Sequence, residues 1–166
     1  MVAVVEICES YDSGGETIEH DIANLNFGSI GAPEIVVATH PITCGTNSFV
    51  KYIRMHWTSG TANKLDNFQV WKSAGAYKTE ETIQCNLEIA AYTAETYATP
   101  VATTYTHNAM PTSDPGAANI GIGGALAGNL VAVGYSDYIK MQLQTTVNTE
   151  AGNANQKTFT FQYDEQ

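Results

Sequence analysis

The sequence predicts an all-β fold, specifically an antiparallel β-sandwich of jelly-roll type with about eight or nine strands and long loops. Polar and apolar residues alternate in several segments, which is the pattern of strands with one buried and one solvated face. No window repeats apolar residues at helical spacing over several turns, whereas Thr, Asn, Gly and Tyr are abundant. The length of 166 residues fits a single domain over residues 1–166.

The expected strands differ in how clearly they alternate. Residues 83–89 give the clearest pattern, because Ile83, Cys85 and Leu87 share one face and polar residues take the other. Asn, Gly and Ala are frequent between residues 138–144 and 158–163, which predicts that these two strands pair as an antiparallel hairpin. The full set of expected strands is residues 2–7, 24–27, 34–38, 49–58, 65–72, 83–89, 101–106, 130–133, 138–144 and 158–163.

Three segments are expected to be loops: residues 10–19, 93–104 and 111–129. The first contains a Gly14-Gly15 pair, and either glycine can adopt a positive φ in a turn. The third is rich in glycine and carries almost no charge. Such a segment can lie flat against another surface, so it is a candidate contact region.

Charge excludes several classes of partner. The chain has 17 acidic and 7 basic residues, for a net charge of −10, and Arg54 is the only arginine. Direct binding to nucleic acid or to an anionic membrane surface is therefore disfavoured, because both depend on clusters of basic side chains. No apolar stretch approaches the roughly 20 residues that span a bilayer.

The N-terminus and the cysteines indicate the cellular compartment in which the protein is expected to be made. Residues 1–6 lack the basic region of a secretory signal, so the chain is expected to be made in the cytoplasm without a signal peptide. Cys8, Cys44 and Cys85 are odd in number and widely spaced, which predicts reduced thiols and neither a disulfide framework nor a CxxC metal knuckle.

Catalytic and cofactor motifs are not expected in this sequence. The run Gly121-Ile122-Gly123-Gly124 lacks the spacing, the following helix and the lysine of a phosphate-binding loop. The four histidines stand in no recognisable catalytic or metal motif, so no catalytic residue, cofactor or metal ligand is assigned. One alternative stays open: Asp12, Glu16 and Glu19 around the glycine turn are oxygen donors of the kind that Ca²⁺ prefers.

Aromatic residues give a different indication. Nine tyrosines and two tryptophans are many for a chain with so little charge, and such rings supply large contact area at low entropic cost. Tyr97 and Tyr105 lie in or beside the second loop, where they could stack on sugar rings. The other interpretation is that the tyrosines are half-buried residues at the sandwich edges.

Several segments resemble one known group of proteins. The segments are residues 24–29, 47–54, 111–124, 136–146 and 157–165. Together they are similar to virion-associated structural proteins of tailed bacteriophages. The resemblance implies a small β-rich protein built into a particle, such as a capsid decoration (cement) protein. It transfers no catalytic residue and does not distinguish head, neck or tail.

These observations lead to a functional expectation. The chain is expected to be a non-enzymatic virion structural protein that binds the major capsid protein or other virion subunits, as a homo-oligomer located in the virion. The alternative is a carbohydrate- or receptor-binding module of a phage tail or fibre. The residues expected to contact a partner are Val2, Val4, Val5, Ile7, Pro111, Pro115, Ile120, Ile122 and Leu126.

Overall fold

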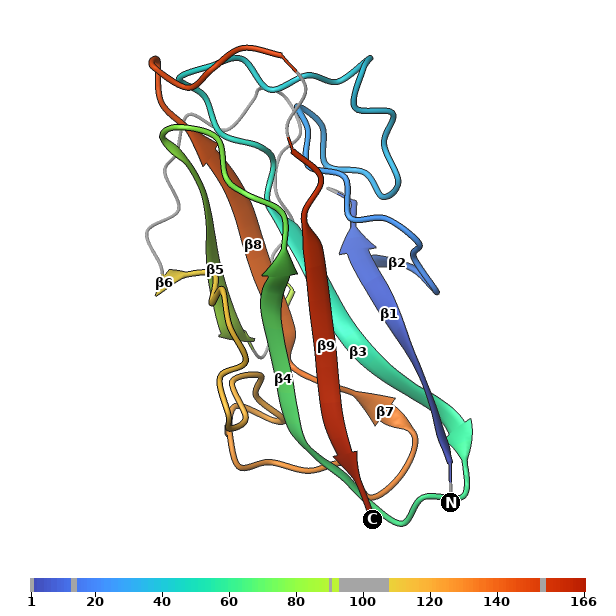
Figure 1. Cartoon of the computed structure of the whole chain (residues 1–166). Helices are drawn as coiled ribbons and strands as arrows, with labels where there is room; N and C mark the ends of the chain where they lie inside the picture. The colour runs from blue at the N-terminus through green and yellow to red at the C-terminus, as the bar shows by residue number, and fades with distance from the viewer. Residues whose placement is uncertain (1, 13–14, 90, 93–107, 153–154) are drawn as a thin grey trace.

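The computed structural model describes residues 2–12, 15–89, 91–92, 108–152 and 155–166. This part of the chain forms nine strands in antiparallel sheets and no helix (Figure 1). The all-β prediction is confirmed, and the arrangement of the sheets is consistent with a β-sandwich. Within the described residues there is also no helix that could cross a membrane.

The larger sheet has seven strands in the order β2-β1-β3-β8-β5-β6, and β7 also pairs with β3. Every pairing in it is antiparallel. Its strands are β1 (Ala3–Tyr11), β2 (Thr17–Glu19), β3 (Lys51–Gly60), β5 (Glu81–Ile89), β6 (Asn108–Ala109), β7 (Gly134–Tyr135) and β8 (Tyr138–Thr145).

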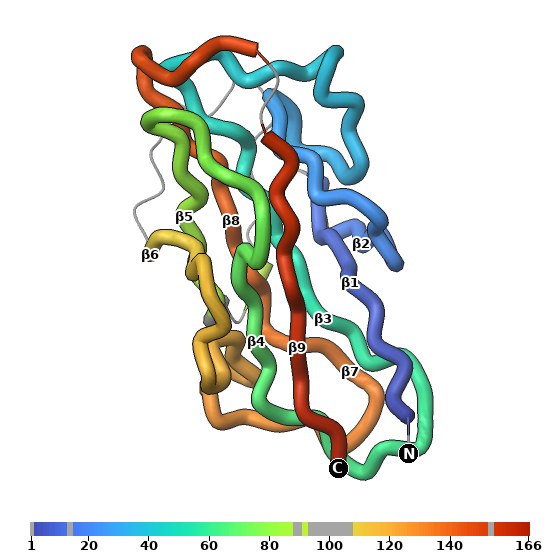
Figure 2. The backbone as a smooth tube through the Cα atoms, in the orientation of Figure 1, coloured from blue at the N-terminus to red at the C-terminus, as the bar shows by residue number. Residues whose placement is uncertain are grey.

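The smaller sheet consists of β4 (Leu65–Ala74) and β9 (Thr158–Glu165), which pair antiparallel along most of their length. Figure 2 shows these two strands side by side in front of the larger sheet. One hydrophobic core joins the two sheets, because buried side chains of both belong to the same cluster. Its buried members are Ala3, Ile53, Met55, Trp57, Leu65, Phe68, Val70, Ile83, Cys85, Met110, Ile120, Ile139, Met141 and Leu143.

The alternation of the sequence explains which face of each strand is buried. In β3, Ile53, Met55 and Trp57 point into the core, while Arg54 and His56 lie on the outer face of the sheet. The outer face also carries a cluster at the start of β3, formed by Val50, Tyr52 and Tyr138 with Tyr92 packed against it. Both faces of the larger sheet are therefore partly covered.

The predicted hairpin between residues 138–144 and 158–163 is wrong. β8 lies between β3 and β5 in the larger sheet, whereas β9 pairs with β4 in the smaller sheet. Each strand has one apolar face in either arrangement, so alternation alone does not choose the partner. The polar connection between β8 and β9 therefore joins strands of two different sheets.

Other expected strands also differ in the structure. Residues 24–27 and 34–38 form loops and turns, held together by a hydrogen bond from Asn26 Nδ2 to the Ile35 carbonyl (2.9 Å). Residues 130–133 contribute only an isolated bridge between Leu130 and Leu65. Residues 101–106 lie outside the described residues. In contrast, β2 lies within the first expected loop.

The segment after β6 covers the free edge of β4. Asn119 accepts a hydrogen bond from the Val70 amide and donates one to the Val70 carbonyl, both at 2.8 Å. The backbone amides of Asn119 and Ile120 donate to the Phe68 carbonyl. An edge strand with unpaired backbone groups invites pairing with another chain, so this segment protects β4 from such pairing.

Asn119→Ala is expected to lower the free energy of unfolding by about 1–3 kcal/mol, because it leaves the partly buried amide and carbonyl of Val70 without these partners. Urea denaturation followed by circular dichroism measures the change. The matched control is Asn129→Ala at an exposed position, where a change within about 0.5 kcal/mol is expected. Equal effects of the two substitutions would contradict the role of Asn119.

Candidate functional site

The exposed large apolar side chains of the described residues gather at the two ends of the molecule. The end of the molecule where both termini lie is here called the terminal end (Figure 1). The exposed side chains of Val2, Val4, Leu126, Val131 and Val133 belong to segments that meet there, since the Thr61 amide donates to the Val2 carbonyl, Leu130 bridges Leu65, and Leu126 borders a hollow with Gln166. The loops of residues 35–48 and 146–152 lie at the opposite end, here called the loop end (Figure 1), and Gly45 of the first lies against Val147 of the second. Val36, Val37 and Val147 in these loops are exposed. Apolar surface that is clustered in this way is typical of sites that contact other molecules.

Short contacts hold the terminal end together. The Ala3 amide donates a hydrogen bond to Glu165 Oε2 (2.8 Å), and the Thr61 amide donates one to the Val2 carbonyl. Leu126 borders an open hollow of about 250 Å³. The other residues lining this hollow are Asp66, Asn67, Ala118, Ala127, Gly128, Asp164 and Gln166. Segments from the start, middle and end of the chain therefore meet at this surface.

The residues expected to contact a partner fall into three groups. Val2, Val4, Pro115 and Leu126 are exposed. Ile120 has an exposed fraction of 0% and belongs to the core, since Asn119 holds this segment against β4. The half-buried group is Val5, Ile7, Pro111 and Ile122, of which all but Pro111 pack against the core. Tyr97 and Tyr105 lie outside the described residues.

Sequence reasoning missed five of the exposed valines: Val36, Val37, Val131, Val133 and Val147. Val131 and Val133 show the reason. Val131 and Val133 are 72% and 61% exposed, among the most exposed large apolar side chains of the described residues. The sequence placed them in a strand, where valine is ordinarily a buried residue. Their position between the Leu130 bridge and β7 leaves both side chains in solvent. The glycines that flank this stretch, Gly128 and Gly134, are the sequence signal that favours a loop here.

Arg54 organises the outer face of the larger sheet. Its guanidinium lies 4.1 Å from the ring centre of Tyr135 and 4.3 Å from that of Tyr138, and it pairs with Glu16 at 2.9 Å. Glu16 Oε1 also accepts hydrogen bonds from Ser10 Oγ and the Tyr138 hydroxyl. Burial opposes ionisation of Glu16, but the Tyr138, Ser10 and Arg54 partners outweigh it and lower its pKa.

These contacts bear on the calcium alternative. Glu16 Oε1 already pairs with the Arg54 guanidinium and accepts hydrogen bonds from the hydroxyl groups of Ser10 and Tyr138. Its neighbours are therefore a cation and hydroxyl groups, and not the set of oxygen ligands that surrounds a Ca²⁺ ion. Among the described residues, Asp12, Glu16 and Glu19 do not form a group of close metal-ligating atoms. The geometry therefore does not favour Ca²⁺ at this turn.

A buried ion pair lies at the loop end of the core. Lys51 Nζ is 2.6 Å from Glu9 Oε1, and the two side chains are 1% and 2% exposed. Lys51 Nζ also donates to the Ala32 carbonyl, which connects β3 to the loop that follows β2. Burial disfavours the charged form of each group, raising the pKa of Glu9 and lowering that of Lys51.

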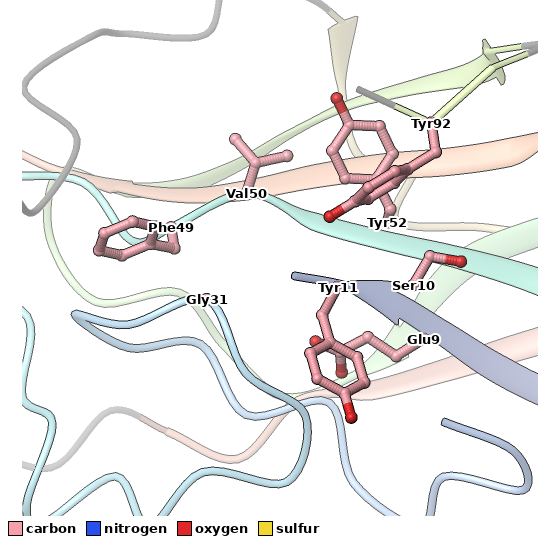
Figure 3. A pocket seen from close by; sticks show the side chains of 8 residues that line it. All are labelled: Glu9, Ser10, Tyr11, Gly31, Phe49, Val50, Tyr52 and Tyr92. Carbon is pink, nitrogen blue, oxygen red and sulfur yellow. The ribbon is translucent and has the colours of Figure 1, made fainter. Parts of the chain in front are cut away.

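A hollow beside this pair is small. Figure 3 shows Tyr52 and Tyr92 against one another at its rim, with ring centres 5.0 Å apart. Its volume of about 10 Å³ suits about one water molecule and no organic ligand. The lining residues are Glu9, Ser10, Tyr11, Gly31, Phe49, Val50, Tyr52 and Tyr92.

One group of metal-ligating side chains converges among the described residues. Glu6, Cys8, His20 and His56 each bring a ligand atom within 4.8 Å of the others. Sequence reasoning assigned no metal, because the four histidines stand in no recognisable metal motif. The available signal was the spacing of Glu6 and Cys8, which puts both side chains on one face of a strand. The pairing of Glu6 with His56 requires the register of β1 and β3, which the sequence does not reveal.

Comparison of the chain with known protein families, with curated proteins and with solved structures finds no match.

Proposed function

We propose that this protein is a non-enzymatic structural subunit of a virion, most specifically a decoration protein that binds and stabilises the capsid shell of a tailed bacteriophage. The observation that carries the proposal is the location of the exposed apolar side chains at the two ends of the molecule. An elongated subunit with contact surface at both ends suits a place between neighbouring subunits.

The size of each surface suits an assembly of many copies. Burying a valine side chain contributes about 1.5–3 kcal/mol, so a few valines give only a modest affinity after the costs of association. When many copies bind to a symmetric lattice, their modest individual contacts together give a high overall affinity. The proposed partners are the major capsid protein or other virion subunits and, as a homo-oligomer, further copies of this chain.

Charge and topology support the same proposal. The net charge of −10 favours a partner surface with basic patches and disfavours direct contact with nucleic acid. The proposal includes a jelly-roll fold, for which the support is that the chain crosses between the two sheets from β3 to β4, from β4 to β5 and from β8 to β9.

The experiment that tests the proposal measures binding of the full chain to phage shells that lack this protein. The shells are purified from the phage that encodes the chain. The wild-type protein is expected to co-sediment with the shells and to saturate at a fixed number of copies per shell subunit. Val131→Ser/Val133→Ser is expected to weaken binding about tenfold or more, since each 1.4 kcal/mol of lost burial is a factor of about ten. Val36→Ser/Val37→Ser tests the loop end in the same way.

The matched control is Thr158→Ser/Gln162→Ser on the exposed face of β9, which is expected to bind like the wild type. Circular dichroism confirms that each variant is folded before its binding is compared. Absence of saturable binding by the wild-type chain would overturn the proposal. Undiminished binding by both valine variants would overturn the role of the two ends.

A further inference from the structure

The group formed by Glu6, Cys8, His20 and His56 lies on the outer face of the larger sheet. Glu6 and Cys8 are two residues apart in β1, so their side chains share a face, and His56 of β3 stands directly opposite Glu6. His20 follows β2 and approaches from the neighbouring segment. The Ile22 amide donates to the Ile7 carbonyl (3.0 Å), which holds this segment against β1.

The ligand atoms are close enough to share one ion. Glu6 Oε1 lies 2.5 Å from His20 Nδ1 and 2.8 Å from His56 Nδ1. Cys8 Sγ lies 3.3 Å from Glu6 Oε1 and 3.5 Å from His20 Nδ1. Neighbouring ligands of a tetrahedral zinc ion are separated by roughly 3.3–3.7 Å, given bond lengths of about 2.0–2.3 Å. The site therefore needs only a small outward adjustment of the two imidazoles.

The donor set selects the kind of ion. One thiol sulfur, two imidazole nitrogens and one carboxylate oxygen match the ligands of Zn²⁺, whereas Ca²⁺ and Mg²⁺ prefer oxygen alone. All four ligands come from the protein, as in structural zinc sites. His20 has 49% of its side chain exposed, so an ion from solution has access to the site.

Neighbouring groups hold the ligands in place. The His56 ring stacks on Tyr135 with ring centres 3.9 Å apart and planes 9° apart, which fixes the orientation of the imidazole. Tyr135 is in turn covered by the Arg54 guanidinium. The Asp21 backbone amide hydrogen-bonds to the Cys8 sulfur, a contact that favours a thiolate. Such outer contacts orient metal ligands and tune their affinity.

Without an ion, the same groups form a hydrogen-bonded network around one carboxylate oxygen. Burial opposes ionisation of Glu6, but hydrogen bonds with His56, His20 and Cys8 outweigh it and lower its pKa to about 2. Burial and the neighbouring Glu6 raise the pKa of the Cys8 thiol to about 12. Binding of Zn²⁺ would displace the thiol proton to solvent and form a Zn–S bond in its place.

We propose that Glu6, Cys8, His20 and His56 form a structural zinc site that fastens the segment around β2 to strands β1 and β3. The site is independent of the proposed virion function, since it lies on the outer face of the sheet and not among the exposed valines. It would add to the contacts that already join the two parts of the chain, which include the short β1–β2 pairing and the hydrogen bond from Ile22 to Ile7.

The test uses the purified full chain, freed of metal by a chelator and titrated with Co²⁺ as a spectroscopic probe and then with Zn²⁺. One Co²⁺ per chain is expected, with the intense visible bands of tetrahedral coordination and a sulfur-to-cobalt charge-transfer band. Zn²⁺ is expected to displace Co²⁺ and to raise the thermal midpoint of unfolding.

Variants separate this site from general binding by histidines or thiols. Cys8→Ser is expected to remove the charge-transfer band. His20→Ala, at an exposed position that leaves the core intact, is expected to weaken Zn²⁺ binding about 100-fold or more, because loss of even an outer contact of a ligand costs about 10- to 100-fold. The matched controls are Cys44→Ser and His40→Ala, which are expected to bind like the wild type.

The proposal is overturned if Co²⁺ gives no charge-transfer band with the folded wild-type chain, or if its visible bands are the weak ones of octahedral coordination. It is also overturned if His20→Ala binds Zn²⁺ as tightly as the wild type, or if Cys44→Ser removes the band. These readouts need no particle, so their failure is distinct from failure of the proposed function.

Discussion

Lys51→Met is expected to lower the free energy of unfolding by about 3–5 kcal/mol, because it leaves the Glu9 carboxylate buried without its cationic partner. Glu9 Oε2 is already buried and has no hydrogen-bond partner among the described residues, so the lost ion pair is not replaced locally. The substitution also removes the donor to the Ala32 carbonyl. Urea denaturation followed by circular dichroism measures the change.

The double variant Glu9→Leu/Lys51→Met shows whether the lost stability comes from the unpaired Glu9 charge or from a packing defect. It is expected to recover most of the lost stability, since replacing both members of a buried pair by apolar residues is often neutral. Lys64→Met is the matched control, because the Lys64–Asp66 pair is partly exposed and is worth less than about 1 kcal/mol. Additive effects of the two single substitutions would contradict this account of the pair.

Phe68→Ala is expected to destabilise the protein by a similar amount, about 3–5 kcal/mol, through loss of apolar burial and creation of a cavity. Phe68 is 1% exposed and projects from β4 into the core between the sheets, with its ring centre 6.1 Å from that of Tyr163. The smaller sheet has only two strands and depends on this core for its attachment.

The comparison for Phe68→Ala is Val147→Ala at a side chain that is 80% exposed, where a change within about 0.5 kcal/mol is expected. Thermal and urea denaturation of both variants provide the measurement. A loss below about 1 kcal/mol for Phe68→Ala would show that the core tolerates a missing ring at the centre of β4. That outcome would contradict the packing described for the smaller sheet.

The sequence predicted the individual strands better than their partners. Alternation located β3, β4, β5, β8 and β9, because in each of these strands the side chains facing the core are mostly apolar. It could not show that β9 pairs with β4, since an apolar face fits either sheet. The two-residue strands β6 and β7 are too short to carry any periodicity.

Surface and site residues were harder to predict for a different reason. Ile120 stands in a glycine-rich stretch that looks exposed, yet backbone pairing with β4 turns it into the core. The grouping of Cys8 with His56 depends on the register of strands that are far apart in the chain. Local pattern determines which face a side chain takes, whereas long-range pairing determines its neighbours.

Electron cryomicroscopy of the phage virions that are proposed to contain this chain tests the central claim most directly. The account predicts density for this two-sheet fold at junctions between shell subunits, with Val131 and Val133 at one end or Val36 and Val37 at the other buried in the contact. Particles that lack the chain, or that hold it with both valine pairs facing solvent, would contradict the account.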